Sequence, residues 1–372
     1  MSPSLPRFYT DALPLKVAVI LLFFIATSLF IHRESLSPTS LHKESQDKGL
    51  QPSPPDHVTG INPGSAPVPE VPNYAFAALL VRQADKKDDG KWDDDPYFWG
   101  LRILAYQLLH HSETRSDYPF VVFVSNDTSE SKRDRLRKDG AVVKEVAPLN
   151  ADWVQTTPNY AELFAKLRLW AHTEYDLLCL LDSDIVLAKS LGGLFDDPAV
   201  LEQKTALDPE KHQEEEGALP ATYVFAAARE TGPGHQYPPS IDRKEDYFEL
   251  DHLNAGMMIF RPDKTLFEHY VKILSQEGKF NPQFPEQSLL NYAHRWNASM
   301  PWKPIGNTWN VNFPKMEDIE KGVASVHEKW WGGDGSPLKR WLAAWKFRAE
   351  GFFEALDLVE GVFEGDGRGG KR

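Results

Sequence analysis

The stretch from Asp176 to Leu187 constrains the fold more than any other part of the sequence. It reads DLLCLLDSDIVL, so an apolar run ends in Asp182-Ser183-Asp184 and apolar residues then resume at once. Such a run is typical of a strand buried on both faces of a parallel sheet. Open α/β sheets bind ligands beyond the carboxyl ends of their strands. Two carboxylates there favour a divalent cation with a diphosphate, although a polar turn that caps local backbone fits the tripeptide equally well.

Strand-like and helix-like segments alternate along the chain. This alternation predicts an α/β fold with a mostly parallel, doubly wound sheet and helices on both faces. The run before Asp182 is then the fourth strand, and its acidic end faces the crevice where the strand order reverses. Strands are expected at 74–81, 120–124, 141–146, 176–181, 221–228, 253–260 and 325–327, and helices at 97–110, 130–138, 161–172, 265–276, 286–294 and 338–353.

The N-terminal residues differ in kind from the rest. Residues 17–31, VAVILLFFIATSLFI, form an uncharged apolar run that is short for a plasma-membrane span but sufficient for a thinner internal bilayer. Arg7 and Lys16 precede it, which favours a cytosolic N-terminus, and no small-residue cleavage site follows. We therefore expect a single-pass type II protein of the Golgi or another secretory-pathway membrane. Its expected parts are a cytosolic tail (1–16), a retained signal anchor (17–31), a flexible stem (32–72), a luminal α/β domain (73–360) and a disordered tail (361–372).

Charge and cysteine content limit the partners and the chemistry. The chain has 41 Lys and Arg against 54 Asp and Glu, a formal charge of -13, which excludes nucleic acid as an expected partner. The single cysteine, Cys179, lies inside the apolar run and is expected to be a core residue. Sequons at Asn126 and Asn297 suit a luminal domain.

A cation held by Asp182 and Asp184 needs a further protein ligand. Of the twelve histidines, His327 is the best candidate because it ends a short apolar run. An ordinary core or surface histidine is the alternative. A mixed nitrogen and oxygen site suits Mn²⁺ somewhat better than Mg²⁺.

Other polar residues have a functional and an ordinary interpretation. Asn254 and Gly256 place an amide and a close backbone approach before a strand, or form a turn. Glu286 and Gln287 open a helix, where an acidic residue also complements the dipole. Lys166 pairs with a phosphate or lies on an exposed helix face.

The order of these residues resembles glycosyltransferase family 8, the retaining glycogenin-like and galactinol-synthase-like enzymes. The resemblance begins near Tyr74 and implies a GT-A fold, a UDP-sugar donor and a divalent cation, usually Mn²⁺. The landmarks are Tyr97-x-x-Gly100, Phe164-Ala165-Lys166-Leu167 through Trp170, Leu180-Leu181-Asp182-Ser183-Asp184 with Leu194-Phe195, Asn254-Ala255-Gly256, Glu286-Gln287-x-x-Leu290-Asn291 and His327.

The resemblance also implies a role for each matching residue. Two aspartates and one histidine would hold the metal, one tyrosine would stack on uracil, and the remaining residues would line the donor or act near the anomeric carbon. The metal ligands are Asp182, Asp184 and His327; the donor-binding residues are Tyr97, Lys166, Ser183, Asn254, Ala255, Gly256 and Lys329; the catalytic residues are Gln287, Glu286 and Lys166.

Three departures from the family pattern stand out. Glu286 replaces the usual aspartate before the glutamine, the loop after His327 reads Glu328-Lys329-Trp330-Trp331 instead of the family's Gly and Lys-Pro-Trp pattern, and the loop at 83–96 is longer. Retention implies same-face attack within an ion pair, which we prefer, or double displacement through Glu286.

Two other functions compete with a transferase. One is a catalytically silent relative that serves as an anchored scaffold or a sugar-binding subunit. The other is a haloacid-dehalogenase-like phosphatase, which needs Thr or Val shortly after a D-x-D-G turn at the first strand, whereas Ile185 follows directly here. The donor sugar, and whether the acceptor is a glycan, a protein, a lipid or a polyol, stay open.

Overall fold

The computed structural model describes residues 72–81, 88, 90–154, 162–206 and 213–366. The expected cytosolic tail, membrane anchor and nearly all of the stem lie outside these residues. Among the described residues, no helix combines the length and the apolar character that a bilayer crossing requires. The C-terminal helix continues to Asp366, into the segment that we expected to be a disordered tail.

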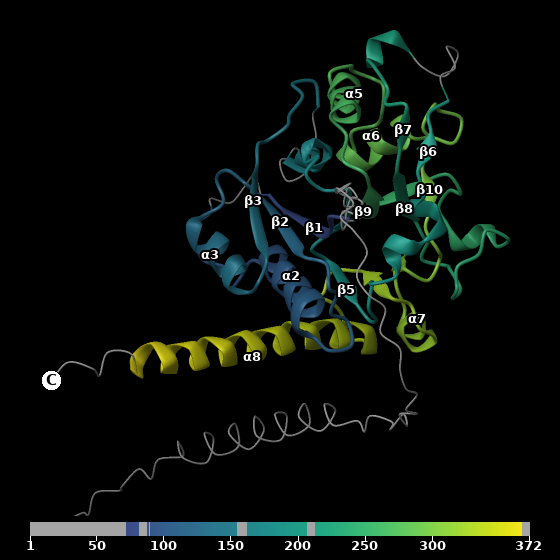
Figure 1. Cartoon of the computed structure of the whole chain (residues 1–372). Coiled ribbons are helices and arrows are strands. Elements are labelled where there is room, and N and C mark those ends of the chain that lie inside the picture. The colour runs from purple at the N-terminus through teal and green to yellow at the C-terminus, as the bar shows by residue number, and fades with distance from the viewer. Residues whose placement is uncertain (1–71, 82–87, 89, 155–161, 207–212, 367–372) are drawn as a thin grey trace, which may run out of the picture. The chain divides into compact units, whose positions relative to one another are not determined.

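One mixed sheet forms the centre of the fold (Figure 1). Its seven strands lie in the order β10-β8-β9-β4-β1-β2-β3. The strands are β1 (Tyr74–Leu80), β2 (Phe120–Ser125), β3 (Val142–Val146), β4 (Leu177–Leu181), β8 (Phe225–Arg229), β9 (Leu253–Phe260) and β10 (Lys303–Pro304).

The first four strands confirm the predicted parallel sheet. β1 is parallel to both β2 and β4, and β2 is parallel to β3. Because β4 lies on the opposite side of β1 from β2, the strand order reverses between β1 and β4, and Asp182 follows β4 at this switch point. β9 departs from the expected direction, since it runs antiparallel to both β4 and β8.

Helices cover both faces of the sheet, as expected (Figure 1). On one face lie α2 (Pro96–Ala105), α3 (Glu130–Lys138) and α8 (Pro337–Asp366). On the other lie η2 (Glu162–Ala171), α5 (Lys264–Leu274) and α6 (Pro285–Ala293), and η2, in the segment where a helix was expected, is a 3₁₀ helix. Cys179 and Leu181 face the first core, whereas Leu178 and Leu180 face the second, which is the period of two of a strand buried on both sides.

A second, three-stranded sheet carries the chain past Asp184. It consists of β11 (Asn310–Asn312), β12 (Ser325–His327) and β5 (Ile185–Leu187), with β12 in the middle. β12 is antiparallel to β5, and this register sets His327 opposite Ile185, the residue that follows Asp184. The remaining elements are the pair β6 (Gln203–Lys204) and β7 (Thr222–Tyr223), helix α7 (Met316–Lys321), and the short 3₁₀ turns η3 (Leu194–Asp196), η4 (Pro198–Val200), η5 (Glu214–Glu216) and η6 (Lys244–Asp246).

The end of the α2 helix holds β5 in place. α2 continues into a π-helical turn, η1 (Tyr106–His110), which contains Gln107. The buried carboxamide of Gln107 donates to the Leu187 carbonyl (2.8 Å) and accepts from the Leu187 amide (2.9 Å). Gln107 therefore bonds to β5 as a neighbouring strand would.

Candidate metal and donor site

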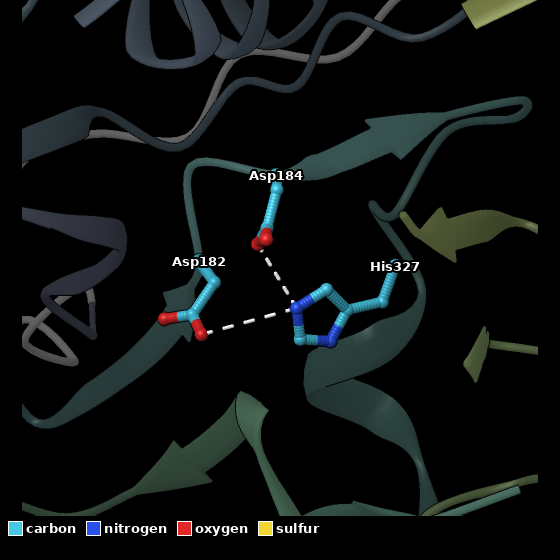
Figure 2. Close-up of side chains that lie close together, drawn as sticks. All are labelled: Asp182, Asp184 and His327. Atoms are coloured by element: carbon cyan, nitrogen blue, oxygen red, sulfur yellow. Dashed lines mark ion pairs between the residues drawn. The ribbon is translucent and has the colours of Figure 1, made fainter. Parts of the chain in front are cut away.

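Two aspartates and one histidine meet at the carboxyl end of β4. His327 Nε2 lies 2.9 Å from Asp184 Oδ1 and 3.9 Å from Asp182 Oδ2 (Figure 2). One ligand atom from each residue lies within 4.8 Å of the other two, a group that could hold a metal ion. All three side chains are partly buried. Two carboxylate oxygens and one imidazole nitrogen form a mixed oxygen and nitrogen donor set that could hold a divalent cation.

The approach of His327 depends on a missing side chain at Gly256. A Cβ atom added there would lie 2.2 Å from His327 Cε1 and 2.5 Å from Nδ1, far inside van der Waals contact. The Gly256 carbonyl also accepts a hydrogen bond from the Asp182 amide (2.8 Å). Strand β9 therefore contacts both Asp182 and His327. In this structure Gly256 therefore makes room for the imidazole.

Hydrogen bonds to Nδ1 orient the His327 ring. Nδ1 lies 3.1 Å from Asn254 Oδ1, which can only accept, so Nδ1 carries a proton and Nε2 is the nitrogen that faces the two carboxylates. Asn312 Nδ2 lies 3.0 Å from the same nitrogen, while Asn312 Oδ1 is buried without a partner among the described residues. With the carboxamide flipped, Oδ1 accepts from Nδ1–H and Nδ2 takes the buried position that has no partner.

The charges of the group stabilise one another. Burial acts to lower the pKa of His327, but the Asp184 carboxylate outweighs it and the pKa is raised. Burial acts to raise the pKa of Asp184, but the charge and hydrogen bond of His327 lower it. The charged form of His327 carries a proton on Nε2. A cation bound at Nε2 would replace that proton as the positive partner of the two carboxylates.

Lys166 joins the metal group to Glu286. Its ammonium lies 2.8 Å from Asp182 Oδ1 and 2.7 Å from Glu286 Oε1, and both Lys166 and Glu286 are about 5% exposed. Although desolvation acts against the charge, the two carboxylates raise the pKa of Lys166, so the amine is charged at neutral pH. The alternative expectation, that Lys166 lies on an exposed helix face, is wrong because its ammonium is buried between two carboxylates.

Gln287 is held at both ends of its carboxamide. Oε1 accepts from the Ala255 amide (2.9 Å), and Nε2 donates to Glu230 Oε2 (3.2 Å). The same Glu230 oxygen lies 2.7 Å from His252 Nδ1, and this hydrogen bond is the main cause of a raised pKa at His252. Gln287 thus lies beside Asn254 and Ala255, as the sequence order suggested, in a fixed orientation.

Tyr97 and Lys329 both lie beside Trp331. The Tyr97 ring meets the Trp331 ring edge-on at 4.9 Å, and Lys329 Nζ lies 6.0 Å from the Trp331 ring. Ser183 is set by Gly100 of α2, since a Cβ atom at Gly100 would lie 1.9 Å from the Ser183 carbonyl oxygen. The Tyr97-x-x-Gly100 pattern therefore docks the helix on the D-x-D turn.

Known proteins similar to this chain settle its family. No protein-family model matches it. Galactinol synthase 1 of Solanum lycopersicum is 31% identical over 248 residues, which are 62% of this chain and 67% of that protein. The chain belongs to glycosyltransferase family 8, that of the galactinol synthases. Galactinol synthase 1 of Ajuga reptans is 30% identical over 244 residues, with the same coverage, and an uncharacterised Schizosaccharomyces pombe protein is 29% identical over 327 residues, 80% of this chain and 82% of that one.

Solved structures align less closely. The glycosyltransferase GlyE of Streptococcus pneumoniae aligns with 73% of this chain at 13% identity and a TM-score of 0.44, and this chain spans only 60% of GlyE. Mouse xyloside xylosyltransferase 1 aligns with 71% of this chain, and 99% of its own, at 13% identity and a TM-score of 0.43.

Two of the three departures from the family 8 pattern can be described from the contacts of the residues concerned. Glu286 reaches Lys166 from the first turn of α6. In the altered loop after His327, Trp330 Nε1 donates to the Pro96 carbonyl (3.1 Å) at the start of α2, and Trp331 contacts Tyr97. This loop is therefore tied to the helix that carries Tyr97.

Three contributors were missed in the sequence: Asn312, Glu230 and His252. Asn312 lies in β11, whose pairing with β12 sets it opposite His327, and the pattern Asn-Val-Asn gives no sign of that pairing. Glu230 follows directly on β8, so a carboxylate at the end of a predicted strand was the available signal. His252 becomes informative only through its contact with Glu230.

Proposed function

We propose that this family 8 chain is a retaining glycosyltransferase that moves a sugar from a UDP-sugar to an acceptor hydroxyl. The observation that carries the proposal is the convergence of Asp182, Asp184 and His327 at the switch point of the sheet. Open α/β sheets bind their ligands at this place. The carboxylate and imidazole donor set fits a divalent cation, Mn²⁺ or alternatively Mg²⁺, and when bound such a cation neutralises charge that develops on the departing diphosphate.

Different residues of the chain would bind different parts of the donor. On the β1 side, Tyr97 with Trp331 offers aromatic surface for a uracil ring, and Lys329 lies within reach of that surface. On the β9 side, Asn254, Ala255 and Gln287 form a polar, hydrogen-bonded layer suited to a sugar ring. In this proposal Ser183 and Gly256 line the donor between the two sides.

The contacts of Glu286 favour same-face attack over double displacement. A carboxylate nucleophile must be free to approach the anomeric carbon. Glu286 is 5% exposed and bonded to the charged Lys166, which is itself bonded to Asp182. We assign Glu286 to holding Lys166, whose ammonium supplies fixed positive charge beside the metal group.

Release of UDP from a panel of UDP-sugars tests the proposal. We expect the purified full chain to require Mn²⁺ or Mg²⁺, and Asp184→Ala to lose activity while it stays folded. Asp94→Ala is the matched control because Asp94 is an exposed aspartate of the loop before α2. Activity that survives Asp184→Ala sinks the assignment. A folded wild-type chain that binds no UDP-sugar indicates the silent scaffold instead.

A further inference from the structure

Two exposed phenylalanines contact each other on this protein. Phe248 is 56% exposed and Phe313 is 46% exposed, and their ring centroids lie 5.6 Å apart at 66°. Among the large apolar side chains that the described residues expose, these are the two whose rings meet. Joined apolar surface on a soluble domain marks a binding site more often than a scattered residue does.

The backbone of Phe313 is held in an unfavourable conformation. Its φ of 51° is the one positive value outside glycine in the described chain, and Pro314 follows it. Such a conformation is strained in a residue with a side chain and persists only where the surroundings enforce it. Here the Thr231 hydroxyl donates to the Asn312 carbonyl (2.8 Å) and accepts from the Asn312 amide (2.7 Å), which fixes the chain just before Phe313.

Both rings are anchored one step from the candidate site. Phe313 follows Asn312, whose side chain contacts His327 Nδ1. The Phe248 amide donates to the Glu230 carbonyl (3.3 Å), and the Glu230 carboxylate accepts from Gln287. The backbone segments that carry the two rings are therefore tied to the metal ligands and to Gln287 by these contacts.

The pair also lies on the side away from Tyr97. Tyr97 belongs to the helix after β1, whereas Phe248 is bonded to the segment that leaves β8. Strands β4 and β9 lie between β1 and β8 in the sheet. With uracil on the Tyr97 side, the sugar of the donor lies between Tyr97 and Phe248. The acceptor then approaches the sugar from the Phe248 side.

The surrounding charge narrows the chemistry of that acceptor. The segment 242–251, which carries Phe248, contains five acidic residues and two basic ones, so it repels phosphate and carboxylate groups. The hydrogen-bonded pair of Glu230 and His252 is partly exposed and offers polar partners for hydroxyl groups. An apolar wall with a few polar groups beside it is the usual make-up of a small-molecule site.

We propose that Phe248 and Phe313 form an aromatic wall that binds the C–H face of a neutral, polyhydroxylated ring, and that this ring belongs to the acceptor. The proposal rests on the transfer reaction proposed above, because it supplies a site for that reaction's second substrate. A free cyclic polyol and the terminal sugar of a glycan share this chemistry.

Saturation-transfer NMR on the full chain, with UDP and Mg²⁺ in a detergent without a sugar headgroup, tests the wall. The ring probes are methyl glucoside, as a model of a glycan end, and a cyclohexane polyol, as a free polyol. Open-chain sorbitol lacks the ring face, and glucose 6-phosphate adds charge. We expect saturation of the ring C–H protons, and signals at least about threefold weaker from sorbitol and the phosphate, the range that aromatic contacts supply.

Variants of the two phenylalanines separate the effect of losing an aromatic ring from the effect of a loss of folding. Phe248→Ala and Phe313→Ala should each weaken the ring signals at least about threefold. Phe313→Gly should weaken them equally while raising the melting temperature, because glycine accepts a positive φ without strain. Phe347→Ala is the matched control, since Phe347 is 66% exposed on α8 and should leave the signals unchanged.

The outcomes distinguish this wall from the transferase itself. Absence of ring signals with the wild-type chain, or undiminished signals with Phe313→Gly, overturns the wall. UDP and Mg²⁺ that fail to raise the wild-type melting temperature count against the transferase instead. A cyclohexane polyol signal without a methyl glucoside signal identifies a free polyol as the acceptor, and the reverse identifies a glycan end.

Discussion

The Glu286 carboxylate lies 2.7 Å from the Lys166 ammonium, and both groups are almost completely buried. Lys166 is bonded in turn to Asp182, so removing Glu286 leaves a buried cation with one carboxylate partner. This relationship gives Glu286 a testable structural role.

We expect Glu286→Ala to lower the free energy of unfolding by about 3–5 kcal/mol, the usual effect of removing one partner of a buried ion pair. Glu286→Gln, which still accepts from Lys166, should cost less and keep measurable transfer. Urea unfolding and UDP release measure the two effects, with Glu268→Gln, an exposed residue of α5, as control. A sugar covalently attached to Glu286, found by mass spectrometry, would contradict this role.

Gly256 should be essential for metal affinity. Gly256→Ala places a methyl group 2.2 Å from His327 Cε1, which must move the imidazole away from the aspartates. We expect Mn²⁺ affinity to fall at least about tenfold, the lower end of what disturbing a ligand's support costs. Mn²⁺ binding followed by electron paramagnetic resonance measures the change. Gly351→Ala in α8, where an added Cβ meets nothing within 4 Å, should bind Mn²⁺ normally. Equal Mn²⁺ affinity in the two variants would refute this role of Gly256.

His294 should make stability depend on pH. Burial lowers the pKa of His294 to about 3, while Nδ1–H donates to the Met300 carbonyl and Nε2 accepts from the Tyr270 hydroxyl. Because the folded pKa lies below the ordinary 6.5, the unfolded chain binds an extra proton between these values. The stabilising contribution is therefore complete above pH 6.5 and declines as the pH falls.

Urea unfolding at pH 7.5 and at pH 5 measures this dependence. The slope from His294 should reach about 1.4 kcal/mol per pH unit below pH 6. His294→Gln should be less stable at pH 7.5 and should lack this part of the slope. An unchanged slope in His294→Gln would assign the pH dependence to other groups.

We propose that the chain is anchored with its catalytic domain in the lumen, as the apolar run at 17–31 suggests. Asn126 and Asn297, the residues of the two sequons that would carry the glycans, are both exposed. In cells, endoglycosidase should increase the protein's mobility, and Asn126→Gln with Asn297→Gln should abolish the change. Absence of glycan on the wild-type protein would count against this topology. Release of the protein from membranes by carbonate would count against it as well.

Much of the fold followed from local pattern. The apolar runs near Phe76, Val122 and Cys179 predicted three buried parallel strands, because burial on both faces leaves an uninterrupted apolar sequence. The direction of β9 was not predictable in this way. LNAGMMIF is equally apolar in either direction, and only its pairing with β4 and β8 makes it antiparallel.

The candidate site was predictable where its residues stand at strand ends or in a family motif. Asp182, Asp184, Lys166 and His327 were all named from sequence, and the structure brings them together. Asn312 and the pair of Glu230 and His252 were not named, because each reaches the site through a contact between segments far apart in the chain. Their roles depend on register, which periodicity does not encode.

The buried carboxamide of Gln107 restricts how this sequence can change in length. It bonds to Leu187, three residues beyond Asp184, from a helical turn that is one residue wider than an α-helical turn. Deleting Tyr106, the residue before it, would rotate Gln107 about the helix axis and turn it away from β5. Insertions and deletions should therefore be selected against in this helix, although it is remote from the metal ligands in sequence.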